Sequence, residues 1–155
     1  MSMSFNAESS RNKGVKLLLF LISPFISLLY SIKTLNTRSS YIVLFLFCLC
    51  FGMAFTVESQ YTEYKGDGVF YRQVFESYQS ITTKEYISDL KTYLEFNDGN
   101  ADFYADTIAF IVSRFTSNYH YFFLLLAFIF AYFQIRSLTF FTSNPNYRFS
   151  IVPLK

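Results

Sequence analysis

Three apolar runs dominate the pattern of hydrophobic and polar positions along this chain. Residues 17–32, 39–57 and 119–135 contain no Asp, Glu, Lys or Arg. An α-helix needs roughly 20 such residues to cross the hydrocarbon core of a bilayer. The pattern therefore predicts an all-α integral membrane protein with two to three spans and a long helical loop between the second and third runs.

The first run is the exception among the three, because it is short and has Pro24 in its middle. A proline inside a membrane helix removes one backbone hydrogen bond and kinks the helix. Residues 17–32 therefore either cross the membrane as a kinked helix or turn back as a re-entrant or interfacial segment. The sequence leaves both alternatives open.

The loop over residues 58–118 has a pattern of its own. Apolar residues recur at helical spacing over residues 69–78, 83–96 and 101–116,. Thr82 with a glutamate three residues later is a capping box, which starts the middle helix,. The stripe predicted for the last helix consists of Tyr104, Ile108, Ile111, Val112 and Phe115. We expect these amphipathic helices to lie at the membrane interface, over the membrane segments.

The distribution of charge supports the same reading. The chain is 52% hydrophobic and 15% charged, whereas soluble domains carry about 25% charged residues. Residues 58–114 contain ten acidic and five basic residues, and the remainder contains eight basic residues against Glu8 alone. Such segregation is typical of a membrane protein with two unlike faces, and it gives no indication of nucleic-acid binding.

Basic residues at the ends of the runs predict the orientation. Lys33, Arg38 and Arg136 fall on one side if the second and third runs both cross, and that side is expected to be cytoplasmic,. The loop 58–118 is then extracytoplasmic. A full crossing by the first run would place the basic residues that precede it on the outer side, which conflicts with the rule.

The predicted organisation is a polar tail over residues 1–14, a membrane region over 15–141, and a tail or the start of a further span over 142–155. We expect the chain to be the amino-terminal portion of a longer protein. Its two cysteines, Cys48 and Cys50, lie inside an apolar run with no further metal ligand near them, so we interpret them as packing residues,. No metal or cofactor is predicted.

One local constellation could carry chemistry, over residues 65–75 (KGDGVFYRQVF). Two glycines flank Asp67 and allow a tight turn, which would hold its carboxylate at the membrane surface. Lys65 and Arg72 bracket this turn and are suited to bind a phosphate. One interpretation is an anionic headgroup site beside a carboxylate. The other is a simple turn and helix N-cap with solvated cations.

Two further features have a structural interpretation. Asp102 and Asp106 are four residues apart, and such a pair near a helix N-terminus is typical of a solvated helix face,. His120 stands between two tyrosines at the start of the third run, where an aromatic residue at the membrane interface is expected,.

The same stretch resembles a known family. The motif G-D-x-x-x-Y-x-x-x-F is made up of Gly66, Asp67, Tyr71 and Phe75. Placed after an apolar segment, it resembles the first outer loop of bacterial polysaccharide polymerases of the Wzy type, and most closely the EpsG-like branch. The resemblance covers about residues 17–141. Family members commonly carry an arginine shortly before the turn, whereas here residues 58–64 contain none and Lys65 stands nearest.

The resemblance implies glycosyl transfer at the outer side of the bacterial cytoplasmic membrane. The substrate would be a polyprenyl-diphosphate-linked oligosaccharide, and a chain-length regulator or a flippase would be a partner. Asp67 is the candidate base that takes the acceptor proton. The candidate substrate contacts are Lys65, Tyr71, Arg72 and Arg114. The alternative is a small non-catalytic membrane protein that binds or scaffolds a partner.

Overall fold

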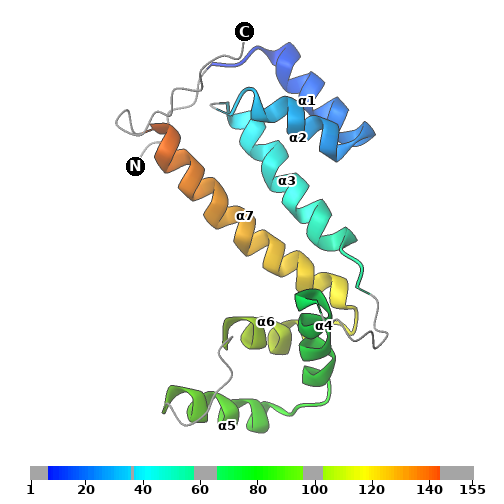
Figure 1. The fold of residues 1–155 in the computed structure, drawn as a ribbon, viewed down its shortest axis with the longest axis vertical. Coiled ribbons are helices and arrows are strands. Elements are labelled where there is room, and N and C mark those ends of the chain that lie inside the picture. Colours follow the sequence, from blue (N-terminus) through cyan, green and yellow to red (C-terminus); the bar gives the residue numbers. More distant parts are fainter. Residues whose placement is uncertain (1–6, 36, 58–65, 96–102, 144–155) are drawn as a thin grey trace. The chain divides into compact units, whose positions relative to one another are not determined.

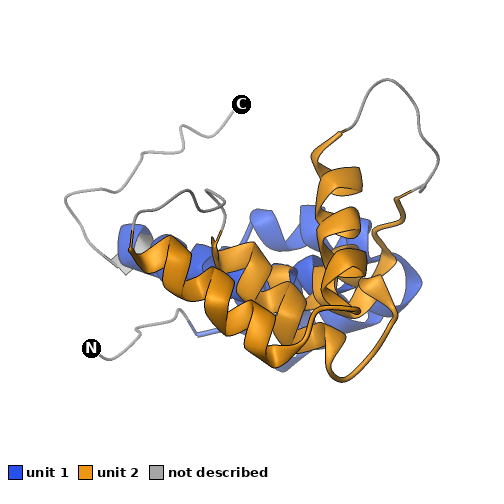
Figure 2. Ribbon diagram, turned by 90° about the horizontal axis from the view of Figure 1, so that it is seen from below, with its two compact units in different colours: residues 1–50, 127–155 blue, residues 51–126 orange. Residues whose placement is uncertain are grey.

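The computed structural model describes residues 7–35, 37–57, 66–95 and 103–143, and every regular element in these ranges is an α-helix (Figure 1). The chain divides into two units, residues 1–50 with 127–155 and residues 51–126 (Figure 2). The helices are α1 (Ser10–Ile22), α2 (Pro24–Ile32), α3 (Arg38–Ala54), α4 (Asp67–Tyr78), α5 (Thr83–Leu94), α6 (Phe103–Ser113) and α7 (Tyr119–Ser143). The all-α prediction is confirmed for the described residues.

The first apolar run forms two helices. Ser23 lies between α1 and α2 in an extended conformation, and its side chain accepts a hydrogen bond from the backbone N–H of Ile26. Pro24 occupies the first position of α2, where its missing N–H costs no helical hydrogen bond,. The two helices pack against each other. Proline therefore starts a new helix here, and a single kinked helix over residues 17–32 is not formed.

Helix α1 also begins earlier than expected. Its N-cap is Ser9, whose side chain accepts a hydrogen bond from the backbone N–H of Asn12 at 3.3 Å. Residues 10–14, predicted as part of a polar tail, are therefore helical. Ser9 is a favoured N-cap residue, so the signal was present in the sequence.

Two longer apolar helices correspond to the second and third runs. Within the described residues, one helix is long and apolar enough to cross a membrane by length and composition, over Tyr119–Phe141 of α7. Only 17% of its apolar window is buried inside the protein, unlike the core helix of a soluble domain. Helix α3 is also apolar but has 17 residues, about 26 Å at 1.5 Å per residue,. Two to three spans therefore remain a prediction.

The unit that contains residues 51–126 is built from α4, α5, α6 and the first turns of α7. The capping box at the start of α5 is confirmed, with the Glu85 carboxylate accepting a hydrogen bond from the backbone N–H of Thr82 at 2.7 Å. Helix α6 packs against α4 and α5. Tyr86 of α5 stacks on Phe110 of α6 with their ring centroids 4.0 Å apart.

The stripe predicted for α6 is only partly buried. Ile108 and Val112 are buried, whereas Tyr104, Ile111 and Phe115 are exposed. The buried face includes Ala105 and Ala109, the second of which is fully buried. Alanines permit close approach of two helices, so the small residues turn α6 toward its neighbours and leave part of the large-residue stripe outside.

Candidate functional site

The turn before α4 places Asp67 at the first position of that helix. Gly66 is the N-cap, with φ −64° and ψ 154°, and its carbonyl accepts a hydrogen bond from the backbone N–H of Val69 at 2.9 Å. A carboxylate in the first turn is favoured by the positive end of the helix dipole. Asp67 is exposed, and no described residue donates a hydrogen bond to its side chain. The carboxylate is therefore open to a ligand.

Gly68 has a packing role. A Cβ atom at this position would lie 3.1 Å from Phe55 Cε1 and 3.2 Å from Val57 Cγ2. The absence of a side chain lets α4 approach the segment that follows α3. By contrast, a Cβ atom at Gly66 would meet nothing within 4 Å. Gly68 is thus in close contact with the segment that follows α3, and Gly66 is not.

The aromatic residues of the motif attach α4 to α7. Phe75 is fully buried and stacks on Phe122 of α7, with ring centroids 5.5 Å apart and planes 15° from parallel. Tyr71, one turn earlier, is half-buried and makes an edge contact with Phe70 at 5.6 Å. Phe75 lies eight residues after Asp67, about 12 Å along the helix. The exposed carboxylate is thus carried by a helix that is fixed at its other end.

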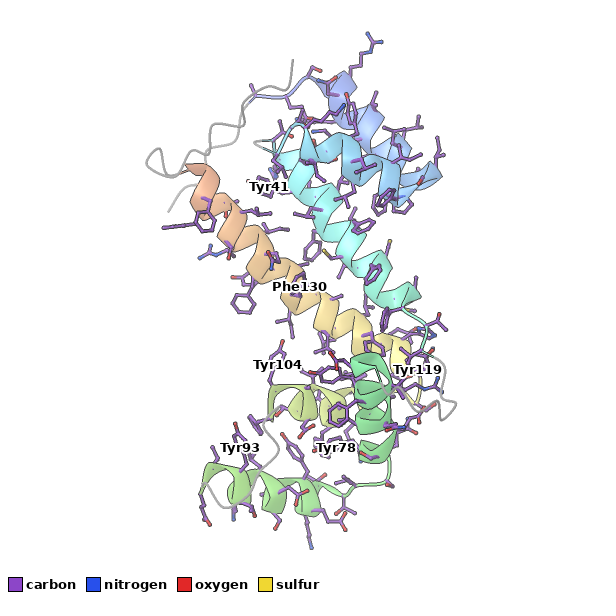
Figure 3. All side chains as sticks on the ribbon, viewed as in Figure 1. Tyr41, Tyr78, Tyr93, Tyr104, Tyr119 and Phe130 are labelled. Carbon is purple, nitrogen blue, oxygen red and sulfur yellow. The ribbon has the colours of Figure 1, made fainter. Side chains whose placement is uncertain are left out.

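The side chain of Arg72 is held by the protein itself. Its Nε lies 2.7 Å from Glu76 Oε1, and one Nη donates to the carbonyl of Val57. Its guanidinium also lies over the ring of Tyr119, 4.3 Å from the centroid. Tyr119 is labelled in Figure 3. The other Nη has no partner that the structure records among the described residues. One Nη of Arg72 is therefore still able to bind a ligand, while the guanidinium as a whole joins α4 to the start of α7.

The ring of Tyr119 also stacks on His120, with centroids 4.2 Å apart. His120 Nδ1 is buried and has no hydrogen-bond partner in the described part of the chain. Arg72, Tyr119 and His120 therefore lie next to one another. The position of His120 at the membrane interface stays a prediction.

Arg114 lies at the other end of α4. Its guanidinium donates to the carbonyl of Tyr78 and to Ser113 Oγ, and it lies 4.8 Å from the ring centroid of Phe110. Tyr78 is eleven residues after Asp67, about 16 Å along the helix. The structure therefore does not bring Arg114 beside Asp67. Lys65, the remaining cation of the predicted site, lies outside the described residues.

Asp106 differs from its predicted setting. It is 8% exposed, and α6, which carries it, packs against α4, which carries Tyr78. Burial, together with the negative charges of Asp106 and Asp89, raises the pKa of Tyr78 to about 12,. The interpretation of Asp106 as part of a solvated face was wrong, because Asp106 is buried where α6 packs against other helices of its unit. Asp102 lies outside the described residues.

The most densely hydrogen-bonded polar cluster in the described chain surrounds Lys16 of α1, which the sequence indicated only as a flanking charge. Lys16 is fully buried, and its Nζ lies 2.6 Å from Glu8 Oε1. Three hydroxyl groups lie 2.8 to 2.9 Å from the same nitrogen, those of Thr37, Ser39 and Ser40. The ammonium group is therefore surrounded by oxygen and satisfied.

The hydroxyl groups around Lys16 are satisfied as well. Ser39 Oγ donates to Glu8 Oε2, and Ser40 Oγ donates to the carbonyl of Thr34 at 2.8 Å. Burial raises the pKa of Glu8, but the hydrogen bonds from Lys16 and Ser39 and the positive charge of Lys16 outweigh this effect and lower it overall,. A closed network of this kind fixes a structure and offers no free group for catalysis.

A spacing of 23 residues separates Lys16 from Ser39, so no local pattern could have indicated their contact.

The described residues contain no cluster of three or more His, Cys, Asp or Glu side chains suited to a metal ion. Chemically, the exposed carboxylate of Asp67 can accept a proton, and Arg72 can contribute positive charge nearby on α4. Comparison of the sequence with protein-family models, with curated proteins and with solved structures finds no match.

Proposed function

We propose that this chain is part of a membrane polysaccharide polymerase that joins lipid-linked oligosaccharide repeat units. It would act in the bacterial cytoplasmic membrane as a multi-pass protein, with residues 58–118 on the outer side. Support comes from the family resemblance of the G-D-x-x-x-Y-x-x-x-F motif, from the apolar helix over Tyr119–Phe141 and from the predicted charge asymmetry.

The observation that carries the proposal is the setting of Asp67. Its carboxylate is exposed at the first position of α4, while Phe75 of the same motif is fully buried against α7. A catalytic group must be held in place and yet reach its substrate. The motif combines both properties in α4, because Phe75 is packed against α7 and the carboxylate of Asp67 is exposed to solvent.

The chemistry requires two functions from the protein. A carboxylate takes the proton from the acceptor hydroxyl group, and cations stabilise the diphosphate that leaves the donor sugar. Asp67 is the proposed base. Arg72, with its remaining Nη, and Lys65 are the proposed diphosphate contacts, and Tyr71 would contact the sugar. Arg114 is reassigned to holding the ends of α4 and α6 together, because its donors bind Tyr78 and Ser113.

One observation favours the alternative of a non-catalytic membrane protein that binds or scaffolds a partner. Arg72 and Arg114 both donate to backbone carbonyls and lie over aromatic rings of their own unit. Cations used in this way stabilise a fold without any ligand. The alternative therefore predicts that Asp67 can be replaced without loss of function.

The test is replacement of Asp67 by asparagine in the full gene, expressed in a strain from which that gene has been deleted. Asp89→Asn is the matched control, since Asp89 is another exposed aspartate of the same loop. We expect Asp67→Asn to abolish glycan chain extension, seen as loss of the polymer ladder on gels, and Asp89→Asn to preserve it. Both proteins should be inserted into membranes in equal amounts. Polymers of normal length from the Asp67→Asn strain would remove Asp67 from the mechanism and favour the scaffold.

A further inference from the structure

Helices α1 and α2 form a hairpin with one intervening residue. Ser23 donates its backbone N–H to the carbonyl of Leu19 at 2.7 Å, and its own side chain caps α2. The hydroxyl of Ser27 on α2 donates to the carbonyl of Lys16 on α1 at 2.8 Å. The chain therefore reverses at Ser23, and α2 runs back along α1 (Figure 1).

The open end of this hairpin is closed by the Lys16 network. Lys16 Nζ reaches Thr37 and Ser40, which follow α2 in sequence, at 2.8 Å each. Lys16 is fully buried, and so are Ser27 and Ser31 on the facing side of α2. Small residues at this interface let the two helices approach closely. The hairpin is thus held at its base by a buried charge whose hydrogen bonds are satisfied.

Neither helix is long enough to cross a bilayer. Helix α1 has 13 residues and α2 has 9, which correspond to about 20 Å and 14 Å at 1.5 Å per residue. The hydrocarbon core of a bilayer is about 30 Å thick. A hairpin of these dimensions reaches roughly the middle of the bilayer and returns.

The surface of the hairpin is divided between an apolar tip and a basic base. Leu21, Ile22 and Phe25 at the tip are 84%, 72% and 59% exposed. At the base, the exposed charged residues are all basic and consist of Arg11, Lys13, Lys33 and Arg38. An apolar end with a cationic rim matches one leaflet of a bilayer, in which acyl chains lie beneath anionic headgroups.

We propose that the α1–α2 hairpin is inserted into a single leaflet rich in anionic lipid, with both of its ends on the same face of the membrane. The arrangement removes the conflict in the charge pattern, because Arg11 and Lys13 then share the cytoplasmic side with Lys33 and Arg38. The proposal rests on the membrane embedding in the proposed function and does not depend on polymerase activity.

A lipid leaflet fits this surface better than a second protein. The exposed apolar side chains occur on both helices and around the tip, and the buried side of the hairpin contains its polar groups. A protein partner would need complementary polar contacts at its rim, whereas the hydroxyl of Tyr30 is the only exposed polar side-chain group on the described helices between the basic base and Ser23.

The experiment uses single cysteines in the full chain with Cys48 and Cys50 replaced by alanine. The labelling positions are Asn12→Cys and Lys33→Cys at the base and Leu21→Cys at the tip, all exposed. Sealed vesicles of phosphatidylcholine with phosphatidylglycerol are treated with a membrane-impermeant maleimide before or after lysis. A nitroxide on each cysteine then reports depth through its relative accessibility to oxygen and to a water-soluble nickel chelate.

We expect Asn12→Cys and Lys33→Cys to react from the same side, and Leu21→Cys to be protected at least tenfold and to report a depth inside the acyl region. Reaction of the two base positions from opposite sides would show a full crossing and overturn the proposal. Leu21→Cys that reacts as fast as the base positions would show that the tip is in water or against a protein, and would overturn it equally. Neither result bears on whether the Asp67→Asn variant loses polymerase activity, so the two proposals can fail separately.

Discussion

Replacement of Lys16 by methionine tests whether the buried network holds the hairpin closed. Methionine keeps much of the volume of the lysine stem but removes the ammonium group. The carboxylate of Glu8, whose side chain is 4% exposed, would then be buried without a cation. Breaking one partner of a buried ion pair in this way costs about 3–5 kcal/mol. Lys13→Met is the matched control, because Lys13 is exposed on the same helix.

The readout is hydrogen exchange of the backbone amides of α1 and α2 in lipid nanodiscs. A cost of about 3–5 kcal/mol corresponds to exchange that is faster by roughly 10²- to 10³-fold or more, up to the rate of the fully open hairpin. Lys13→Met should leave these rates within about threefold of the original protein. The double variant Lys16→Met with Glu8→Gln should recover most of the protection, because it removes the uncompensated charge.

Acidification offers an independent check on the same network. The pKa of Glu8 is lowered in the folded protein from its ordinary value of 4.5, so its stabilisation is present above pH 4.5 and is lost as the pH falls through the lowered value. Protection of α1 should therefore decrease below that pH in the original protein but not in the double variant. If Lys16→Met exchanged like Lys13→Met, the network would not be what closes the hairpin.

Two further predictions concern the unit that contains α4. Gly68→Ser should destabilise this unit and lower its thermal midpoint in detergent, because the new Cβ would press on Phe55 at 3.1 Å. Gly66→Ser, the control, should raise the midpoint slightly by supplying an N-cap side chain. Equal effects of the two substitutions would refute the packing role of Gly68. Tyr78 should make the unit less stable by a few kcal/mol at most as the pH rises from 10 to 12, because its pKa is raised from 10.0 to about 12 and the unfolded chain ionises first,. Stability measured across this range should fall less in Tyr78→Phe, and a parallel fall in both proteins would contradict the assignment.

The elements of the loop could be predicted from the sequence because their signals are local. The capping box of α5 needs only Thr82 and Glu85, and both of its hydrogen bonds are present. The division of the first apolar run also had a local signal, since a serine followed by proline is a favoured helix start. The signal left open both a kinked helix and a segment that turns back, because a transmembrane helix can tolerate Pro24.

The polar clusters could not be predicted because their partners are distant in sequence. Lys16 contacts Ser39 and Ser40 across 23 and 24 residues, and Asp106 is buried in α6, which packs against α4. Helical periodicity indicates which residues share a face, but not which other element covers that face. A basic residue beside an apolar run indicates the orientation of that run but not the partners of the residue, and Lys16 is fully buried,.

Some charged side chains of this unit stabilise its fold and others do not. Only substitution of a charged residue without a structural role can test catalysis separately from folding. Arg72 and Arg114 stabilise α4 through backbone carbonyls, so loss of activity on replacing either would not separate catalysis from folding. Asp67 makes no hydrogen bond or ion pair through its side chain with the described residues, and the packing of α4 involves Gly68 and Phe75. Asp67→Asn removes only the favourable interaction of the carboxylate with the helix dipole, about 0.3–1 kcal/mol, so a loss of glycan extension with normal membrane insertion would have to come from the chemistry of the carboxylate.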